Sequence, residues 1–182
     1  SPETAPLMRM TLVRTQAQKW RFLWTHHHLL LDGWSLPLVF QDAIAFYQAK
    51  PNLPQPPIYR DFIAWLHKQE SSSAASFWQQ ELSGFREATN FGIKKDSNQD
   101  YQTLQTTIPK EICTQLKVFA QKNQVTLSTL VQAAWGILLS RYSGGEEVVF
   151  GVTVSGRTTE LSGFAEMVGL FINTLPLRLK LD

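Results

Sequence analysis

Three consecutive histidines, His26, His27 and His28, end an apolar stretch and are followed by Asp32 and Gly33. Imidazole titrates near pH 6.5, about half a unit below neutral pH, so a histidine can accept or donate a proton at physiological pH. A carboxylate a few residues further on can orient an imidazole or brace the loop that carries it. Glycine allows the backbone to approach a ligand closely or to adopt a positive φ. The segment therefore predicts a site for acid–base chemistry.

The same residues also fit simpler roles. If the strand alternation before them continues, His26 and His28 share a face with Trp24, and His27 points the other way. This separation disfavours a metal site, and the sequence has no HExxH motif or second ligand cluster to complete one. Packed histidines on a strand face, and a simple turn at Asp32-Gly33, remain as structural alternatives.

The neighbouring sequence predicts the elements that hold these residues. Alternation predicts two strands within residues 7–28, paired as a hairpin, with the second strand ending at Asp32-Gly33. Ser35 is expected to cap a helix that carries an apolar stripe as far as Tyr47. Prolines within residues 51–57 then form an extended connector, which is the clearest internal boundary in the chain.

The rest of the chain mixes helices and strands, which predicts an α/β or α+β fold without fixing the order of strands in a sheet. Periodicity and turn residues predict helices at 61–70, from 71 to 82, from 109 to 120 and at 127–142, strands at 101–108, 148–154 and 173–181, and loops at 83–100 and 155–163.

Composition excludes several classes of protein. The 182 residues suit about one domain, and a hydrophobic content of 43% excludes wholesale disorder. A net charge of +2 gives no electrostatic case for binding nucleic acid or an anionic membrane. The single cysteine, Cys113, excludes an internal disulfide and a cysteine-based zinc site. With no membrane-span-length apolar run and no signal-peptide pattern, we expect a cytoplasmic protein, and the first residues suggest a piece of a larger domain.

Several segments together resemble condensation domains of nonribosomal peptide synthetases. Residues 27–33 match the HHxxxDG motif of that family, and Trp34-Ser35 extends the match. Residues 59–65 resemble its YxDFxxW segment, and residues 168–178 resemble its (I/V)GxFxNTxxxR segment. Phe150-Gly151 and Gly156-Arg157 stand where the family usually has FG and GR. The ordered matches span almost the whole chain.

The resemblance implies a chloramphenicol acetyltransferase-like fold with two lobes. Residues 1–58 would form the C-terminal part of the N-lobe, with the HHxxxDG loop, and residues 59–182 the N-terminal part of the C-lobe, so that both ends of the domain are missing. We expect such an isolated chain to be inactive or poorly stable.

The resemblance also implies an acyltransferase that forms an amide bond between a donor acyl or peptidyl thioester and an acceptor aminoacyl thioester. The implied partners are donor and acceptor peptidyl carrier proteins and an adenylation domain on the same or a neighbouring chain. The phosphopantetheine arms belong to the carriers, and no cofactor is expected on the domain itself.

The family's catalytic motif falls on His27, His28, Asp32 and Gly33. His28 is the residue expected to act, either as a general base or by positioning the amine and steadying the tetrahedral intermediate. In the family the Asp faces away from the channel and pairs with an arginine of an upstream RHExLR-type motif, which this sequence lacks, so Asp32 is expected to be without that partner.

The remaining motif residues are expected to shape the site rather than react. Trp34, Ser35 and Asn173 are assigned to the substrate tunnel or to structure, and Gly156-Arg157 to loop shape. Packing roles are expected for the side chains of the YxDFxxW segment: Tyr59, Asp61, Phe62 and Trp65.

Related activities are weighed against amide formation. Heterocyclisation domains have Asp in place of His27, and epimerisation domains differ after the DG pair, so both are disfavoured. A noncatalytic platform for carrier proteins and a stand-alone acyltransferase that uses coenzyme A thioesters remain as alternatives.

Overall fold

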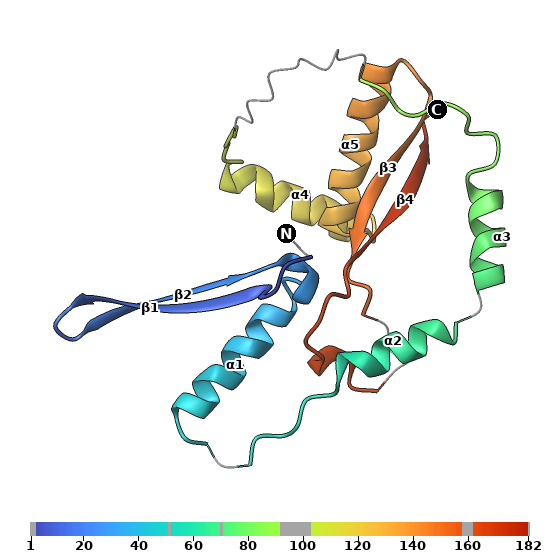
Figure 1. The fold of residues 1–182 in the computed structure, drawn as a ribbon. Coiled ribbons are helices and arrows are strands. Elements are labelled where there is room, and N and C mark those ends of the chain that lie inside the picture. The colour runs from blue at the N-terminus through green and yellow to red at the C-terminus, as the bar shows by residue number, and fades with distance from the viewer. Residues whose placement is uncertain (1–2, 51, 70, 92–102, 158–161, 182) are drawn as a thin grey trace. The chain divides into compact units, whose positions relative to one another are not determined.

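The computed structural model describes residues 3–50, 52–69, 71–91, 103–157 and 162–181. The chain is a mixture of helices and strands, which confirms the predicted class (Figure 1). It divides into two compact units, one of Ser1–Ser71 with Thr153–Thr174 and one of Ser72–Val152 with Leu175–Asp182. Within the described residues, no helix has the length and apolar character needed to cross a membrane.

The first unit begins with a β-hairpin, as predicted. Strand β1 (Met8–Gln16) pairs antiparallel with β2 (Lys19–His26), and Leu12 lies opposite Phe22. The second strand ends at His26 rather than at Asp32-Gly33, because the chain turns into a short 3₁₀ helix, η1 (His28–Leu30). The prediction of a strand through the histidines is therefore wrong.

Helix α1 (Ser35–Tyr47) follows, as the apolar spacing predicts. The residue that precedes its first turn is Trp34, which makes no side-chain capping bond. Ser35 is the first helical residue, and its hydroxyl is turned into a buried polar network, so the prediction of Ser35 as the cap is wrong. The proline connector lies inside the first unit and leads to α2 (Tyr59–His67).

The core of the first unit is a cluster of aromatic and sulfur-containing side chains. Phe62 of α2 packs with Phe164, Met167 and Phe171, and all of them are buried. Phe164 opens a second 3₁₀ helix, η2 (Phe164–Glu166). The cluster joins α2 to the segment that carries the (I/V)GxFxNTxxxR motif.

The second unit is mainly helical. Its helices are α3 (Ser71–Glu81), α4 (Lys110–Lys122) and α5 (Leu127–Ser143). Thr126 caps α5 by accepting the Thr129 N–H, and Gly144 ends the helix in the left-handed conformation at φ 73°. A threonine cap and a glycine stop are ordinary signals for the two ends of a helix.

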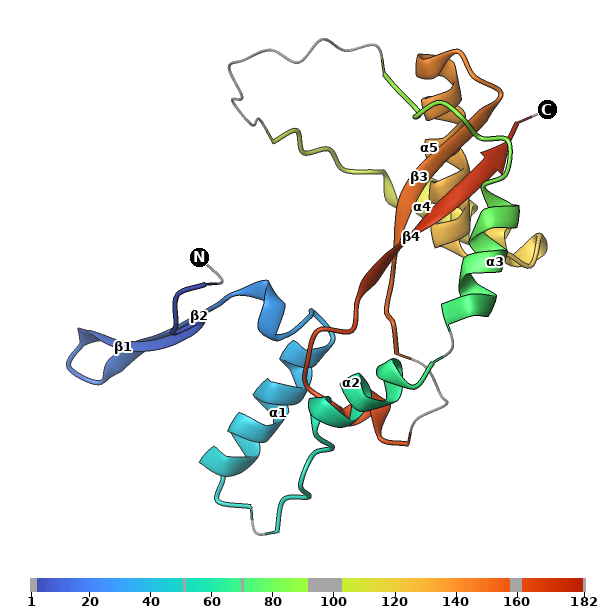
Figure 2. The ribbon, with the colours of Figure 1, turned by 45° about the vertical axis from the view of Figure 1, so that its right-hand side comes forward.

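Two strands accompany these helices. Strand β3 (Glu147–Val154) pairs with β4 (Asn173–Lys180), and the two lie side by side in both views (Figure 2). Gly136 of α5 leaves room for Leu179, since a Cβ at that position would collide with the leucine side chain.

The predicted strand at 101–108 is wrong over residues 103–108, which form neither helix nor strand. Residues 101 and 102, 92–100 of one predicted loop and 158–161 of another lie outside the described residues. The lobe boundary expected after residue 58 stays a prediction.

Candidate active site

The three histidines occupy different positions. His26 ends β2 and its ring meets Trp24 edge to face, with 4.9 Å between centroids. His27 precedes η1, and its Nδ1 accepts the Leu29 N–H at 3.1 Å. An Nδ1 that accepts must be unprotonated, so the neutral His27 ring carries its proton on Nε2. His28 is the first residue of η1 and is exposed.

His28 borders a groove of about 420 Å³ whose other wall comes from the residues around the start of β4. His27 and Asn173 border the same groove, whereas His26 borders a second groove that His27 also lines, so His26 and His28 share neither. The expectation that His26 and His28 share a face, with His27 opposite, is therefore wrong. The cause is the end of β2 at His26, because strand alternation does not continue into a 3₁₀ helix. The structure brings His27, His28 and Asn173 to one place.

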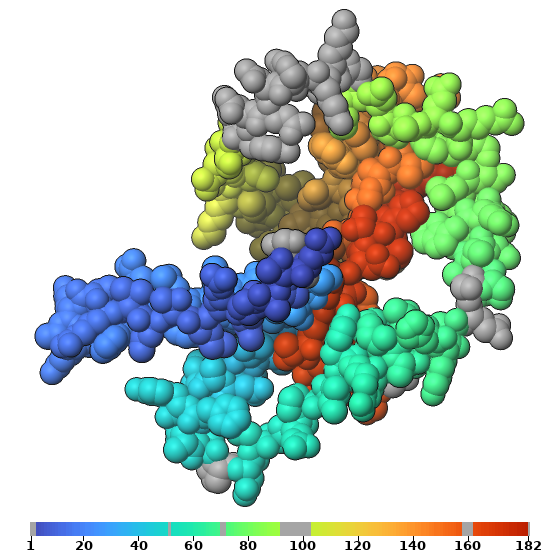
Figure 3. Space-filling view, in the orientation of Figure 1, coloured from blue at the N-terminus to red at the C-terminus, as the bar shows by residue number. Residues whose placement is uncertain are grey.

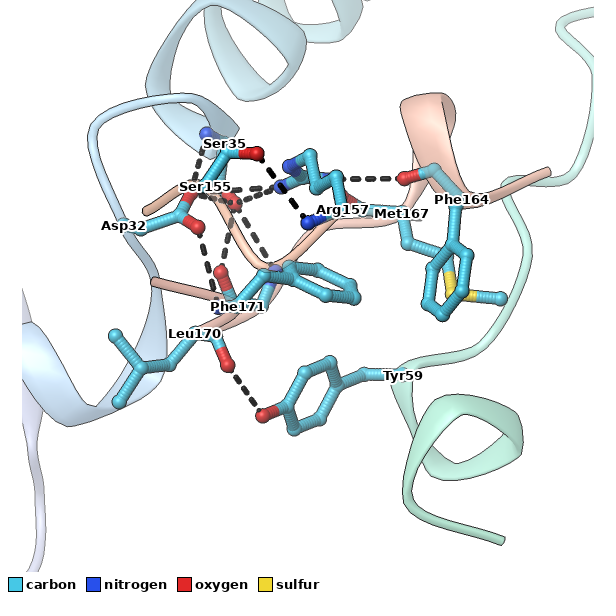
Figure 4. A network of polar contacts seen from close by, with 10 residues as sticks. Asp32, Ser35, Tyr59, Ser155, Arg157, Phe164, Met167, Leu170 and Phe171 are labelled. Atoms are coloured by element: carbon cyan, nitrogen blue, oxygen red, sulfur yellow. Dashed lines mark hydrogen bonds and ion pairs between the residues drawn. The ribbon is translucent and has the colours of Figure 1, made fainter. Parts of the chain in front are cut away.

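Asp32, four residues after His28, does not line this groove and is buried with 1% of its surface exposed. Its Oδ1 accepts the N–H of Ser35 and lies within hydrogen-bond distance of the Ser35 hydroxyl, each at 2.9 Å. Its Oδ2 accepts the N–H of Phe171 at 3.1 Å. Figure 4 shows these bonds, which join Asp32 to Ser35 at the start of α1 and to Phe171 of the (I/V)GxFxNTxxxR motif. Both carboxylate oxygens are engaged by the protein, so Asp32 acts here as a brace.

Ser35 is the second hub of this network and has no exposed surface. Its Oγ accepts the Gly169 N–H at 3.0 Å and a bond from Arg157 Nη2 at 3.1 Å. The same oxygen lies 2.9 Å from the Gly169 carbonyl and from Asp32 Oδ1, and its single proton can serve either of them. The hydroxyl therefore joins the start of α1 to the backbone of residue 169.

Arg157 supplies the positive charge of the network. Its Nη2 lies 3.4 Å from Asp32 Oδ1, and its side chain is 7% exposed. Its Nη1 donates to the carbonyls of Phe164 and Met167 at 2.6 and 3.0 Å, and the guanidinium lies 4.0 Å from the centre of the Phe171 ring. Asp32 is expected to lack the partner from the upstream motif, which this sequence does not contain; the structure shows that Arg157, 125 residues downstream, pairs with it instead.

These contacts set the protonation state of Asp32. Burial alone would raise the pKa of its carboxyl group, because it penalises the charged form. Hydrogen bonds from the Ser35 hydroxyl and from the N–H groups of Phe171 and Ser35, together with the Arg157 charge, outweigh burial and hold the pKa below its ordinary value. Asp32 is therefore a carboxylate at neutral pH.

Residues 59–65, the segment predicted to pack, also contact the residues that Asp32 and Ser35 bind. The Tyr59 hydroxyl donates to the Leu170 carbonyl at 2.6 Å. Its ring lies where a Cβ on Gly169 would be, so only glycine allows this approach. Burial, with a smaller effect from the Asp32 charge, raises the pKa of Tyr59, which keeps its hydroxyl protonated and able to donate. Tyr59, Phe62 and Trp65 thus have the packing roles expected of them. The packing role expected of Asp61 is wrong, because its side chain is 56% exposed and makes a surface ion pair with Arg60.

Other motif residues lie away from these contacts. Gly33 is exposed, its φ is not positive, and a Cβ there would meet nothing within 4 Å. A left-handed turn at Gly33 is therefore excluded, and close approach to a ligand stays a prediction. Trp34 is exposed beside it. Asn173 is exposed at the start of β4, and its Oδ1 accepts the Thr174 N–H at 2.8 Å.

Sequence reasoning missed the pairing of Arg157 with Asp32 and the central place of Ser35. The Gly156-Arg157 pair is the signal that could have found the arginine. Gly156 has φ 63° and sits directly against the Phe171 carbonyl, a position that a side chain could not share, and this turn delivers Arg157 to the network.

Fold and site together define an α/β protein in which a histidine motif beside a groove is braced by a buried carboxylate–guanidinium network. The sequence profile described as Condensation domain matches residues 2–182. The chain belongs to the condensation domain family.

Relatives among characterised proteins are large synthetases. Chondramide synthase cmdD of Chondromyces crocatus is 42% identical over 188 residues, an alignment that covers 99% of this chain and 5% of the synthase. Bacitracin synthase 3 of Bacillus licheniformis is 37% identical over 185 residues, covering 97% of this chain and 3% of that protein. The chain therefore spans only a few per cent of the length of these relatives.

Solved structures share the fold. The SgcC5 protein from Streptomyces globisporus superposes with a TM-score of 0.75 at 24% identity, over 98% of this chain and 42% of SgcC5. The first condensation domain of the calcium-dependent antibiotic synthetase, solved with a substrate analogue, gives a TM-score of 0.68 at 19% identity, over 97% of this chain and 43% of that one. The fold of this chain is thus that of part of a condensation domain.

Proposed function

We propose that this chain contributes the histidine site of an acyltransferase that forms amide bonds in nonribosomal peptide synthesis. The donor is an acyl or peptidyl thioester and the acceptor is an aminoacyl thioester, each held on the phosphopantetheine arm of a carrier protein. The observation that carries the proposal is the exposed His28 ring beside a groove, with the loop behind it fixed by the buried Asp32 network.

The reaction needs little chemistry from the protein. The acceptor amine attacks the thioester carbonyl, a C–N bond forms, and the C–S bond breaks after a tetrahedral intermediate. The amine loses a proton, and the departing sulfur of the donor arm takes one up. Two tethered reactants gain rate mainly from proximity and orientation, so the protein's tasks are alignment and the handling of one proton.

His28 is the residue proposed to perform this second task. Its ring is open to the groove, so a substrate amine can reach it, and it serves as general base or as the group that positions the amine and steadies the intermediate. His27 has a different part, because its Nδ1 holds the Leu29 N–H and fixes the first turn of η1. Asp32 positions the loop that carries both histidines.

The experiment is His28→Ala in the complete condensation domain, with loaded donor and acceptor carrier proteins and dipeptidyl transfer followed by mass spectrometry. Loss of a group that handles the proton lowers the transfer rate by about 10²–10⁴-fold. His67→Ala is the matched control, since His67 is an exposed histidine in the last turn of α2 and should leave transfer unchanged.

The alternatives predict other results. Unchanged transfer in the His28→Ala protein would favour a noncatalytic platform that only docks carrier proteins. Transfer from a free coenzyme A thioester, but not from a loaded carrier, would favour a stand-alone acyltransferase. Both outcomes contradict the proposal.

A further inference from the structure

The groove beside His28 has an apolar wall formed by Leu29, Leu170 and Ile172. Two of these side chains have clear exposure to solvent, with Leu29 54% and Ile172 39% accessible. The two histidines and residues with uncharged polar side chains complete the lining, and no Asp, Glu, Lys or Arg of the described residues borders it. A group entering this groove therefore meets aliphatic surface and an imidazole.

The apolar wall is held in place by its backbone. Leu170 and Ile172 flank Phe171, whose ring is buried in the core while both neighbours border the groove. The Tyr59 hydroxyl holds the Leu170 carbonyl, and Asp32 holds the Phe171 N–H. A wall with its backbone anchored in this way can discriminate between ligands by shape.

The residues that line the groove favour an aliphatic ligand over a charged one. An aliphatic group gains free energy by leaving water, at about 25 cal/mol per Å² of apolar surface. A charged side chain would find no opposite charge among the lining residues and would gain nothing from their aliphatic surface. At about 420 Å³ the groove lies in the range of small-molecule sites and accommodates one amino-acid side chain with part of its tether.

We propose that the groove beside His28 binds the apolar side chain or acyl chain of a thioester-linked substrate, and that Leu170 and Ile172 determine which chain sizes it accepts. The inference rests on the proposed function, because it takes the substrate to be held on a pantetheine arm. It goes further by naming the class of group bound and the residues that select it.

The test measures binding, so it does not depend on catalysis. The probes are hydrolysis-resistant pantetheine amides of leucine, alanine and lysine, titrated into the complete condensation domain by calorimetry. One series has a free amine, like an acceptor, and an N-acetylated series resembles a donor. We expect the leucyl probe to bind at least about tenfold more tightly than the alanyl and lysyl probes in one series, which identifies the substrate involved.

Substitutions of the wall locate the discrimination. Leu170→Ala should weaken binding of the leucyl probe about tenfold and leave the alanyl probe within about twofold, because only the longer chain reaches the removed side chain. Leu170→Met, which conserves volume, should retain the preference. Leu66→Ala is the matched control, since Leu66 is a half-exposed leucine of α2 that does not line the groove.

Two further variants test the same wall without changing Leu170. Ile172→Ala removes an exposed residue whose loss the core should tolerate, and Tyr59→Phe frees the Leu170 carbonyl without touching the groove. Both should reduce the ratio of leucyl to alanyl affinity. Tyr47→Phe, at a 93% exposed tyrosine, should not.

Equal affinity for leucyl, alanyl and lysyl probes in both series would overturn the inference, as would an equal loss for all probes in Leu170→Ala. Discrimination among probes in a domain that shows no His28-dependent transfer would keep the inference and remove the proposed function. His28-dependent transfer in a domain that does not discriminate among the probes would keep the proposed function and remove the inference.

Discussion

The hairpin β1–β2 and the network around Asp32 are neighbours in the first unit, yet they are built on opposite principles. The hairpin has regular pairing and clear alternation, and its surface, drawn in dark blue in Figure 3, is largely open on the face shown. Its large side chains are exposed, with Phe22 at 54%. The network has little regular structure, and Asp32, Ser35 and Phe171 are almost completely buried. In this unit, the regular secondary structure of the hairpin is therefore not where the side chains are most deeply buried.

The difference shows what each kind of sequence signal reports. Alternation reports the local conformation, and it predicts the hairpin although no described residue covers most of its large side chains. The motif residues report contacts between distant segments, since bonds from Asp32, Ser35 and Tyr59 all reach residues 169–171. Removing motif side chains should therefore cost far more stability than removing hairpin side chains of the same type.

The largest effect is expected for Phe171→Ala. The Phe171 ring packs against Phe62 and Tyr59, with centroids 4.7 and 5.2 Å away, so its loss leaves a cavity in the core. We expect a loss of about 3–5 kcal/mol in the free energy of unfolding, measured with urea. Phe22→Ala in the hairpin is the matched variant and should cost much less. Similar losses of unfolding free energy in both variants would show that the two phenylalanines contribute equally to stability, and would contradict the prediction.

Arg157→Ala should follow at about 3 kcal/mol, because it leaves the buried Asp32 carboxylate without its counter-charge. It also frees the carbonyls of Phe164 and Met167. Arg60→Ala is the control, since Arg60 makes an ion pair with Asp61 at 3.7 Å on the surface and should not change urea unfolding. A harmless Arg157→Ala would mean that the network does not stabilise the fold.

Ser35→Ala should cost about 2 kcal/mol, because the buried Gly169 N–H loses its acceptor and Asp32 loses a donor. Ser76 offers the comparison, since its hydroxyl bonds to the Ser72 carbonyl on the exposed surface of α3. Ser76→Ala should change unfolding by less than about 0.5 kcal/mol. Equal losses of unfolding free energy in the two variants would show that the buried bonds of Ser35 stabilise the fold no more than a surface serine does.

The smallest effect is expected in the acid range. The pKa of Asp32 lies below its ordinary value of 3.8, so the folded state favours the carboxylate, and this contribution is complete above that value. It is lost as the pH falls through the lowered pKa, since protonation then costs more in the folded protein. Unfolding free energies measured from neutral pH to below pH 3.8 should fall less steeply in Asp32→Asn than in the native protein.

Glu147 must be separated from this effect. Its pKa is also lowered, mainly by the hydrogen bond from Arg178 at 2.7 Å and further by Lys180. Glu147→Gln should therefore remove its own part of the acid dependence, and the double variant should remove both parts. An unchanged acid slope in Asp32→Asn would show that the carboxylate is not specially stabilised in the folded state.

Most elements could be predicted from the sequence, because their signals are local. The alternation of the hairpin and the glycine stop at Gly144 are examples. The failures have a common physical cause. A strand at 103–108 needs a partner that alternation cannot supply, and Leu104 is left 95% exposed. The partner of Asp32 could not be predicted because periodicity does not report contacts across 125 residues.

The site, like the fold, has parts that the sequence predicts and parts that it does not. The motif identifies His27, His28 and Asp32 from their spacing, and the structure brings the two histidines to one groove. What spacing could not give is the end of β2 at His26, which decides where each ring points. The position of the strand end thus determines which histidines lie together.

The Asp32–Phe171 bond also has a consequence for the order of events during protein synthesis. Its two partners are 139 residues apart, so the chain through residue 171 must leave the ribosome before the bond can form. Until then the histidine loop is without Ser35's bonds to Gly169 as well, and the Asp32 carboxylate is left to water. The hairpin closes locally and can form early, whereas the loop beside it must wait for a segment 139 residues further along the chain.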